Sequence, residues 1–199
     1  MIQVQAIMIL SSYLLGAIPF GYILTQKRTG LNILKEGSGN IGSTNVRRVA
    51  GKRIAFQVQI LDMMKGLIPV SVVLLCNKSG LFDFPDYFIF LVAFCTILGH
   101  NFSVFLRFRG GKGVNTTLGA SLLVAPIHVL CAVGVYCLVK KILKYTSAGS
   151  IALALTLLAS GLILQSGEWL LIYLAFCCLM ILLRHIPNLR RLFSGEEIL

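Results

Sequence analysis

The chain has 199 residues, of which 57% are hydrophobic and only 13% are charged. This composition is too apolar for an ordinary water-soluble domain and indicates one polytopic membrane domain covering residues 1–199. A formal net charge of +11 would favour nucleic-acid binding in a soluble protein. In a membrane protein the expected partner is the lipid bilayer, and the side of the membrane on which each loop lies decides where basic residues occur. We therefore predict no nucleic-acid binding.

Six apolar segments are long enough to enter or cross a bilayer, whose hydrocarbon layer of about 30 Å requires about 20 residues per helix. They cover residues 2–26, 54–76, 86–106, 114–139, 148–166 and 168–183. Lys27 and Arg28 follow the first segment rather than precede it, so we expect a retained helix and not a cleaved signal peptide. Pro126 lies near the middle of the fourth segment, and because proline removes a backbone donor we predict two short helices around it, forming a shallow hairpin.

Basic residues cluster in four stretches, at residues 27–53, 107–112, 140–144 and 184–191. Cytoplasmic loops of membrane proteins are enriched in Lys and Arg. A single crossing by residues 114–139 would export the last two clusters, whereas a break at Pro126 returns all four to the cytoplasm. The sequence therefore predicts an all-α integral membrane protein, a seven-helix transmembrane bundle with its N-terminus outside and its C-terminus in the cytoplasm.

The first basic loop contains GSGNIGSTNVRR at residues 37–48. Its glycines permit unusual backbone dihedrals and expose N–H groups, its polar side chains add donors, and its arginines offer the planar fork that suits phosphate. A phosphate site and a capped loop before a helix both fit this pattern. The candidate substrate-binding residues of the loop are Gly37, Gly39, Asn40, Gly42, Ser43, Thr44, Asn45 and Arg47.

The glycines of this loop also match the GxGxxG fingerprint of dinucleotide-binding proteins. That fingerprint follows a hydrophobic strand, whereas residues 33–36 end in two charged residues, and Asp62, twenty positions after the last glycine, lies inside an apolar segment. We therefore exclude a dinucleotide and predict no cofactor. The six cysteines lack metal-ligand spacing, and no metal site is predicted because the carboxylates near the loops are limited to Glu36, Glu196 and Glu197.

The second basic loop lies within GHNFSVFLRFRGGKGVN at residues 99–115. Glycines flank Lys112 at the start of a predicted short helix, and backbone donors, an ammonium group and a helix N-terminus all favour an anion. The loop lacks the first glycine and the Ser/Thr of a Walker A motif. Ordinary anchoring of a cytoplasmic loop by basic residues is the alternative. The candidate substrate-binding residues are His100, Gly110, Gly111, Gly113 and Asn115.

Charged residues also occur at the end of the last apolar segment and inside the second one. Arg184, a candidate substrate-binding residue, is followed by His185 and Asn188, and a His beside an Arg at this position serves either as a headgroup contact or in catalysis. Asp62 and Lys65 lie three residues apart on one helix face, where charges at membrane depth are costly unless paired. We expect an internal ion pair, with a substrate contact as the alternative.

In this order, the segments strongly resemble those of the bacterial acyl-phosphate:glycerol-3-phosphate acyltransferases. The resemblance covers nearly the whole chain. It rests on five stretches, namely SYLLG with IPFG within residues 12–21, GSGNIGSTNVRR, Leu61 and Asp62 with Lys65 and Gly66, the GH…GGKG segment, and Arg184 with His185 and Asn188. Ser43 stands where the family often has alanine, a departure that leaves the resemblance intact.

This resemblance implies a glycerol-3-phosphate 1-O-acyltransferase that moves a fatty acyl group from acyl phosphate to the 1-hydroxyl of sn-glycerol-3-phosphate. The expected products are lysophosphatidic acid and inorganic phosphate, made in phospholipid synthesis at the cytoplasmic face of the bacterial inner membrane. Motif matching implies functional roles for Asn40 and Asn45 and catalytic roles for Ser38, Arg48, Lys112, His185 and Asn188.

An acyl phosphate is already activated, so no acyl-enzyme nucleophile is required, and the HxxxxD motif of another acyltransferase class is absent. We expect catalysis by positioning and charge stabilisation, with Arg48 and Lys112 neutralising phosphates. Substrate oxygens would be bound by Ser38, Asn45 and Asn188. The proton acceptor is either His185 or a substrate phosphate. The alternative function is a transporter or binding protein for organic phosphates, which the small size and the lack of a repeat oppose.

Overall fold

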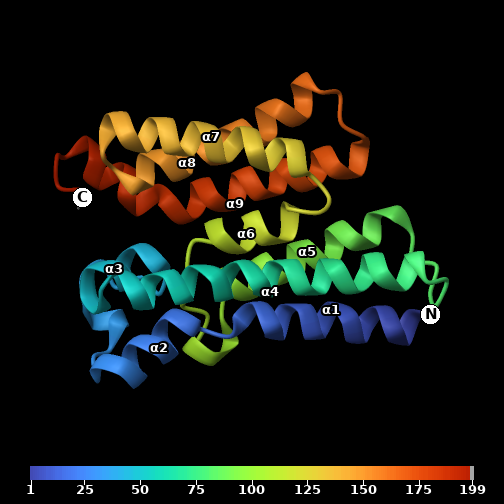
Figure 1. Cartoon of the computed structure of the whole chain (residues 1–199), viewed down its shortest axis with the longest axis horizontal. Helices are drawn as coiled ribbons and strands as arrows, with labels where there is room; N and C mark the ends of the chain where they lie inside the picture. The colour runs from blue at the N-terminus through green and yellow to red at the C-terminus, as the bar shows by residue number, and fades with distance from the viewer. Residues whose placement is uncertain (198–199) are drawn as a thin grey trace. The chain divides into compact units, whose positions relative to one another are not determined.

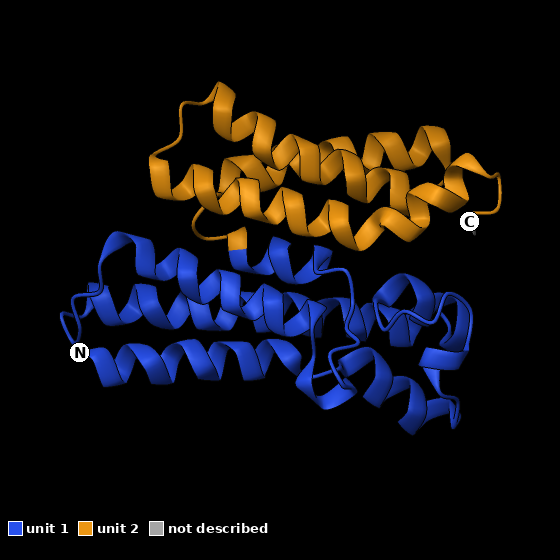
Figure 2. Ribbon diagram, turned by 180° about the vertical axis from the view of Figure 1, so that it is seen from behind, with its two compact units in different colours: residues 1–120 blue, residues 121–199 orange. Residues whose placement is uncertain are grey.

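Every regular element within residues 1–197, the part of the chain that the computed structural model describes, is a helix (Figure 1). The all-α prediction is therefore confirmed. Six helical stretches in this part are long and apolar enough to cross a membrane, namely Ile2–Thr29, Lys52–Lys78, Asp86–Leu106, Pro126–Leu143, Thr146–Ile163 and Glu168–Phe193. The chain divides into two compact units, unit 1 covering residues 1–120 and unit 2 beginning at Ser121 (Figure 2).

Unit 1 begins with a helix that is broken at Pro19. Helix α1 (Ile2–Ala17) ends before the proline and α2 (Phe20–Thr29) starts directly after it. Proline has no N–H to donate and its ring clashes with the preceding turn, so a helix cannot continue unchanged through this position. Residues 2–26 are predicted as one helix, and the structure differs because Pro19 interrupts the helix between Ala17 and Phe20.

The other elements of unit 1 are short turns and helices that follow in chain order. They are the 3-10 turn η1 (Ile33–Lys35), α3 (Ser43–Ala50), α4 (Lys52–Lys78), α5 (Asp86–Asn101), the 3-10 turn η2 (Val104–Leu106) and α6 (Val114–Ser121), whose last residue belongs to unit 2. Helix α1 packs along α5, and α4 packs against both α3 and α5.

Glycines bring the backbones of unit 1 into direct contact. A Cβ added to Gly16 of α1 would overlap the carbonyl oxygen of Thr96 in α5, and one added to Gly99 of α5 would overlap that of Tyr13 in α1. Small residues at such crossings let membrane helices approach closely. The close approach continues beyond the helix ends, where Ser103 Oγ donates to the carbonyl of Ala17 at 2.5 Å. The end of α5 is thereby held beside the Pro19 break.

The predicted break at Pro126 is confirmed. Helix α6 ends at Ser121, and α7 (Pro126–Leu143) begins with the proline itself, at the first helical position where its missing N–H costs nothing. The expectation of two short helices is right for α6 but wrong for α7, which continues to Leu143 and has 18 residues. The extension includes Lys140, whose ammonium lies 5.4 Å from the ring centre of Tyr136 and whose charge favours a helix C-terminus.

Unit 2 contains α7, α8 (Thr146–Ile163) and α9 (Glu168–Phe193), with α8 packed against both of the others. A side-chain hydrogen bond joins His128 Nε2 and Ser166 Oγ at 2.9 Å. Helix α9 is longer than the predicted segment 168–183, since it continues through Pro187 to Phe193. The residues expected where the last helix leaves the membrane are therefore part of that helix.

Candidate functional site

Asn45 organises the first glycine-containing loop. Its side chain is 1% exposed, and its Oδ1 accepts the N–H of Ser38 at 2.9 Å. Its Nδ2 donates to the backbone carbonyls of Glu36 at 3.0 Å and Asn40 at 2.9 Å. Gly37 has a φ of +58°, and a Cβ there would overlap Asn45 Oδ1. Asn45 thus uses both amide hydrogens and its oxygen to hold the loop, whereas the sequence hypothesis had it bind a substrate oxygen.

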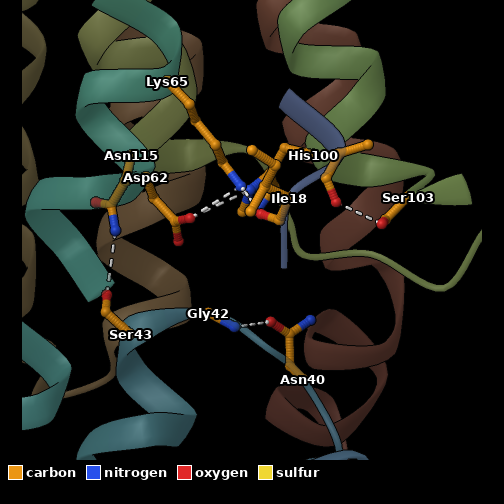
Figure 3. Close-up of polar contacts among 10 residues, drawn as sticks. Ile18, Asn40, Gly42, Ser43, Asp62, Lys65, His100, Ser103 and Asn115 are labelled. Carbon is orange, nitrogen blue, oxygen red and sulfur yellow. Dashed lines mark hydrogen bonds and ion pairs between the residues drawn. The ribbon is translucent and has the colours of Figure 1, made fainter. Parts of the chain in front are cut away.

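The loop passes into α3 at Gly42, the residue before the first helical turn. The N–H of Gly42 donates to Asn40 Oδ1 at 2.8 Å, so Asn40 also shapes the loop (Figure 3). Of the two arginines on α3, Arg47 is exposed while Arg48 is half-buried and in contact with other groups. The remaining candidates of this loop, all half-buried at its rim or in the first turn of α3, are Ser38, Gly39, Gly42, Ser43 and Thr44.

The second loop, residues 110–113, lies directly on the end of α5. The N–H of Gly111 donates to the carbonyl of His100 at 3.0 Å. A Cβ on Gly110 would overlap that same carbonyl oxygen, and a Cβ on Gly111 would overlap Nε2 of the His100 ring. Gly113 has a φ of +80°, a value that favours glycine. The loop therefore needs glycine on both sides of Lys112, which is half-buried.

One hydrogen bond joins the two loops within unit 1. Asn115 Nδ2, in the first turn of α6, donates to Ser43 Oγ, in the first turn of α3, at 3.1 Å and across 72 positions of sequence (Figure 3). The N-termini of α3 and α6 each follow one of the cationic, glycine-containing loops. Helix N-termini carry partial positive charge and favour anions. The structure thus brings the first two predicted motifs together.

Next to these loops lies a buried group of ionisable side chains. Lys65 Nζ is 3.0 Å from Asp62 Oδ1 and donates to the carbonyl of Ile18 at 2.8 Å, at the Pro19 break (Figure 3). His100 Nδ1 lies 3.7 Å from the same carboxylate oxygen. The predicted internal ion pair is confirmed. The sequence did not indicate that Lys65 also reaches the Ile18 carbonyl or that His100 faces Asp62.

The third predicted motif lies on α9 in unit 2. His185 is 2% exposed, and its Nδ1 lies 2.8 Å from the carbonyl of Ile181. Asn188 Nδ2 donates to Glu197 Oε1 at 2.5 Å, and Arg191 Nε donates to the other oxygen of Glu197 at 2.9 Å. Arg184 is half-buried on the same helix. Sequence reasoning named Glu197 only when metal ligands were considered, and its charge close to two basic residues was the available signal.

The charge on Glu197 is stabilised by its partners. Burial opposes ionisation, but hydrogen bonds from Asn188 and Arg191 and the positive charge of Arg191 outweigh it, so the pKa of this carboxyl lies below its ordinary value of 4.5. A carboxyl with a lowered pKa in the folded state stabilises the fold above its ordinary pKa, and this stabilisation is lost as the pH falls through the folded value.

We therefore expect the melting temperature of Glu197→Gln to be lower than that of the wild type at pH 7, because the neutral amide binds Arg191 less strongly. Below pH of about 4.5 the wild type should lose this advantage, and the two melting curves should converge. Thermal unfolding in detergent between pH 3 and 7 measures the difference. Glu196→Gln at the exposed neighbouring position is the control, and an equal effect of both substitutions would contradict the role of Glu197.

Among the described residues, His, Cys, Asp and Glu side chains form no group of three or more that could hold a metal ion. The six cysteines all lie within the described residues, and none of them forms a disulfide bond. The candidate chemistry of both units is that of cations, amides and two histidines, His100 and His185. Such groups bind phosphate oxygens and transfer protons.

Comparison with known proteins agrees with this chemistry. A family model described as glycerol-3-phosphate acyltransferase matches residues 6–195. A glycerol-3-phosphate acyltransferase of Clostridium acetobutylicum is 40% identical over 192 residues, covering 96% of this chain and 97% of the relative. One from Staphylococcus aureus strain Newman is 38% identical over 194 residues, covering 96% and 95%.

Two solved structures are similar over almost the whole chain. The crystal structure of PlsY (YgiH), described as an integral membrane glycerol 3-phosphate acyltransferase in its glycerol 3-phosphate form, gives a TM-score of 0.89 at 32% identity and covers 98% of this chain and 94% of that chain. The lysophosphatidic acid form of PlsY gives a TM-score of 0.83 at 31% identity with the same coverage.

Proposed function

Because the chain belongs to the glycerol-3-phosphate acyltransferase family and is an integral multi-pass membrane protein, we propose that it transfers a fatty acyl group from acyl phosphate to the 1-hydroxyl of sn-glycerol-3-phosphate. The products are lysophosphatidic acid and inorganic phosphate. The observation that carries this proposal is the hydrogen bond between Ser43 and Asn115, which joins two cationic, glycine-containing loops in unit 1. Two neighbouring anion sites suit a reaction in which both reactants carry a phosphate.

In the proposed mechanism the 1-hydroxyl oxygen attacks the acyl carbonyl carbon, and the bond from that carbon to the phosphate oxygen breaks. Inorganic phosphate leaves with the bonding electrons. Arg48 and Lys112 neutralise the phosphates, and Ser38 and Asn188 donate hydrogen bonds to substrate oxygens. Asn45 acts indirectly, because its three hydrogen bonds fix the backbone from which the first loop presents its N–H groups.

His185 is the proposed acceptor of the hydroxyl proton. The carbonyl of Ile181 can only accept a hydrogen bond, so the Nδ1 of His185 carries the donor hydrogen. In the neutral ring Nε2 is then the basic nitrogen, which can accept a proton from a hydroxyl. A substrate phosphate is the competing acceptor.

Replacement of His185 by Ala distinguishes these acceptors. If His185 takes the proton, kcat at saturating substrate should fall by about 100-fold or more, as is usual for loss of a general base. Phosphate release in detergent measures the rate. A near-wild-type kcat would assign the proton to the substrate phosphate and leave His185 a packing role.

We also propose the topology that the basic residues predict. Adding α6 to the six candidate spans gives seven membrane helices, with the N-terminus outside and the active site and C-terminus on the cytoplasmic side of the bacterial inner membrane. The support is that this arrangement keeps all four basic clusters in the cytoplasm. Labelling of cysteines introduced at residues 140–145 from outside intact cells would contradict it.

The proposed function is tested by inorganic phosphate release from acyl phosphate by the purified protein in detergent. The expected release depends strictly on glycerol-3-phosphate and is matched by formation of lysophosphatidic acid. A transporter or a simple binder of organic phosphates would release none. Release that proceeds equally without glycerol-3-phosphate would indicate a hydrolase and contradict the transfer reaction.

A further inference from the structure

Asp62, Lys65 and His100 form a buried group of ionisable side chains that the proposed reaction does not use directly. Asp62 and Lys65 are each 2% exposed and His100 is 3% exposed. Burial of an ion pair costs several kcal/mol per ion, and apolar residues of similar volume often stabilise a fold equally well. Ionisable residues at membrane depth are therefore indicators of function more than of stability.

Lys65 connects helix α4 to the Pro19 break. Its ammonium donates to the carbonyl of Ile18 at 2.8 Å and lies 5.4 Å from the ring centre of Phe20, the first residue of α2. Asp62 holds the same ammonium at 3.0 Å from the neighbouring turn of α4. The lysine position is thus fixed from both sides of the break and from its own helix.

Asp62 in turn faces the residue on which the second loop lies. Its Oδ1 is 3.7 Å from Nδ1 of His100, and the backbone carbonyl of His100 accepts the N–H of Gly111 at 3.0 Å. The His100 ring fills the space that a Cβ of Gly111 would take. A shift of the ring therefore moves Gly111 and, with it, the next residue, Lys112.

We propose that Asp62, Lys65 and His100 are positioning residues that hold the loop of residues 110–113 in the geometry required for binding a substrate phosphate. Lys65 anchors Asp62 to the Pro19 break (Figure 3), and Asp62 orients the His100 ring. His100 supports the loop through its carbonyl and its ring. This role replaces the direct substrate contact that the sequence predicted for His100. It rests on the proposed function, because the loop is the proposed phosphate site.

Replacement of both Asp62 and Lys65 by apolar residues distinguishes an ion pair that only stabilises the helix packing from one that positions the loop. Removal of one partner leaves an uncompensated buried charge, so Asp62→Leu alone should unfold at a markedly lower temperature. The double variant Asp62→Leu, Lys65→Met removes both charges and should recover much of the thermal stability. If the pair only braces the helices, recovery of stability brings recovery of activity.

The test measures melting temperature, kcat and the KM of each substrate for the double variant in detergent. We expect KM for at least one phosphate substrate to rise about 10-fold or more, because a displaced loop no longer presents its donors at the positions of the phosphate oxygens. A purely structural defect lowers the amount of active enzyme and leaves KM unchanged. Wild-type KM values for both substrates would overturn the proposal.

Two further variants keep the test decisive. His100→Phe retains a ring over Gly111 but cannot interact with Asp62 through Nδ1. It should therefore raise the same KM as the double variant. If the double variant does not fold, unchanged KM values in His100→Phe overturn the proposal. Lys78→Met with Asp83→Leu removes one acid and one base at exposed positions of unit 1 and should behave as the wild type. A wild-type protein without glycerol-3-phosphate-dependent release would refute the proposed function instead.

Discussion

Replacement of Lys112 by Met is expected to lower kcat/KM by about 100- to 1000-fold while the protein remains folded. Lys112 stands between glycines on a loop whose backbone is fixed by His100, and its ammonium is proposed to neutralise charge on a substrate phosphate. Removal of one preorganised group that stabilises developing charge typically costs two to three orders of magnitude in rate. Steady-state phosphate release with both substrates varied measures the loss.

Two control variants are needed to interpret the result for Lys112→Met. Lys112→Arg keeps the charge but changes the donor geometry, so it should retain part of the activity. Lys141→Met removes an exposed lysine from the last turn of α7 and should leave kcat/KM within a factor of about two. If Lys112→Met were as active as Lys141→Met, the loop would only anchor the protein at the membrane surface and the proposed site would be wrong.

Replacement of Gly111 by Ala is expected to lower kcat/KM by about 100-fold, with a smaller loss of thermal stability. The added Cβ would overlap Nε2 of the His100 ring, which is itself buried and cannot move aside freely. Either the ring or the loop must shift, and a displacement of about 1 Å near a reacting group can cost about 100-fold in rate. Kinetic constants and the melting temperature of the purified variant test this expectation.

The matched control for Gly111→Ala is Gly134→Ala on α7, where an added Cβ meets no atom within 4 Å. Alanine favours helix over glycine, so this control should keep full activity and be as stable as the wild type or slightly more so. An active Gly111→Ala enzyme with an unchanged KM would show that the loop tolerates the shift. It would also weaken the positioning role of His100.

Prediction from the sequence succeeded where one local property decides the structure. The break at Pro126 follows from the missing backbone donor, and the pairing of Asp62 with Lys65 follows from helix geometry and the cost of isolated charge in an apolar segment. The break at Pro19 was equally local and could have been predicted. It was missed because the uncharged segment around it was treated as one crossing.

The contacts that assemble the site could not be predicted in this way. The bond between Ser43 and Asn115 joins residues 72 positions apart, and nothing in either motif specifies the partner. The commitment of Asn45 to three backbone groups depends on the path of the whole loop. Residue type indicated anion-binding chemistry, but which side chains face a ligand and which hold the loop depends on tertiary packing.

The length of the first helix relates the enzyme to the thickness of the membrane around it. Helix α1 has 16 residues and is about 24 Å long, whereas the hydrocarbon layer is about 30 Å thick. The candidate span Ile2–Thr29 includes α2 as well, so the Pro19 break, where Lys65 binds the Ile18 carbonyl, lies within the span and not at its end. Lipids with longer chains would change the depth of this polar break in the bilayer and the hydrophobic match of the span. An enzyme of phospholipid synthesis is thus exposed, through α1, to the chain length of the lipids around it.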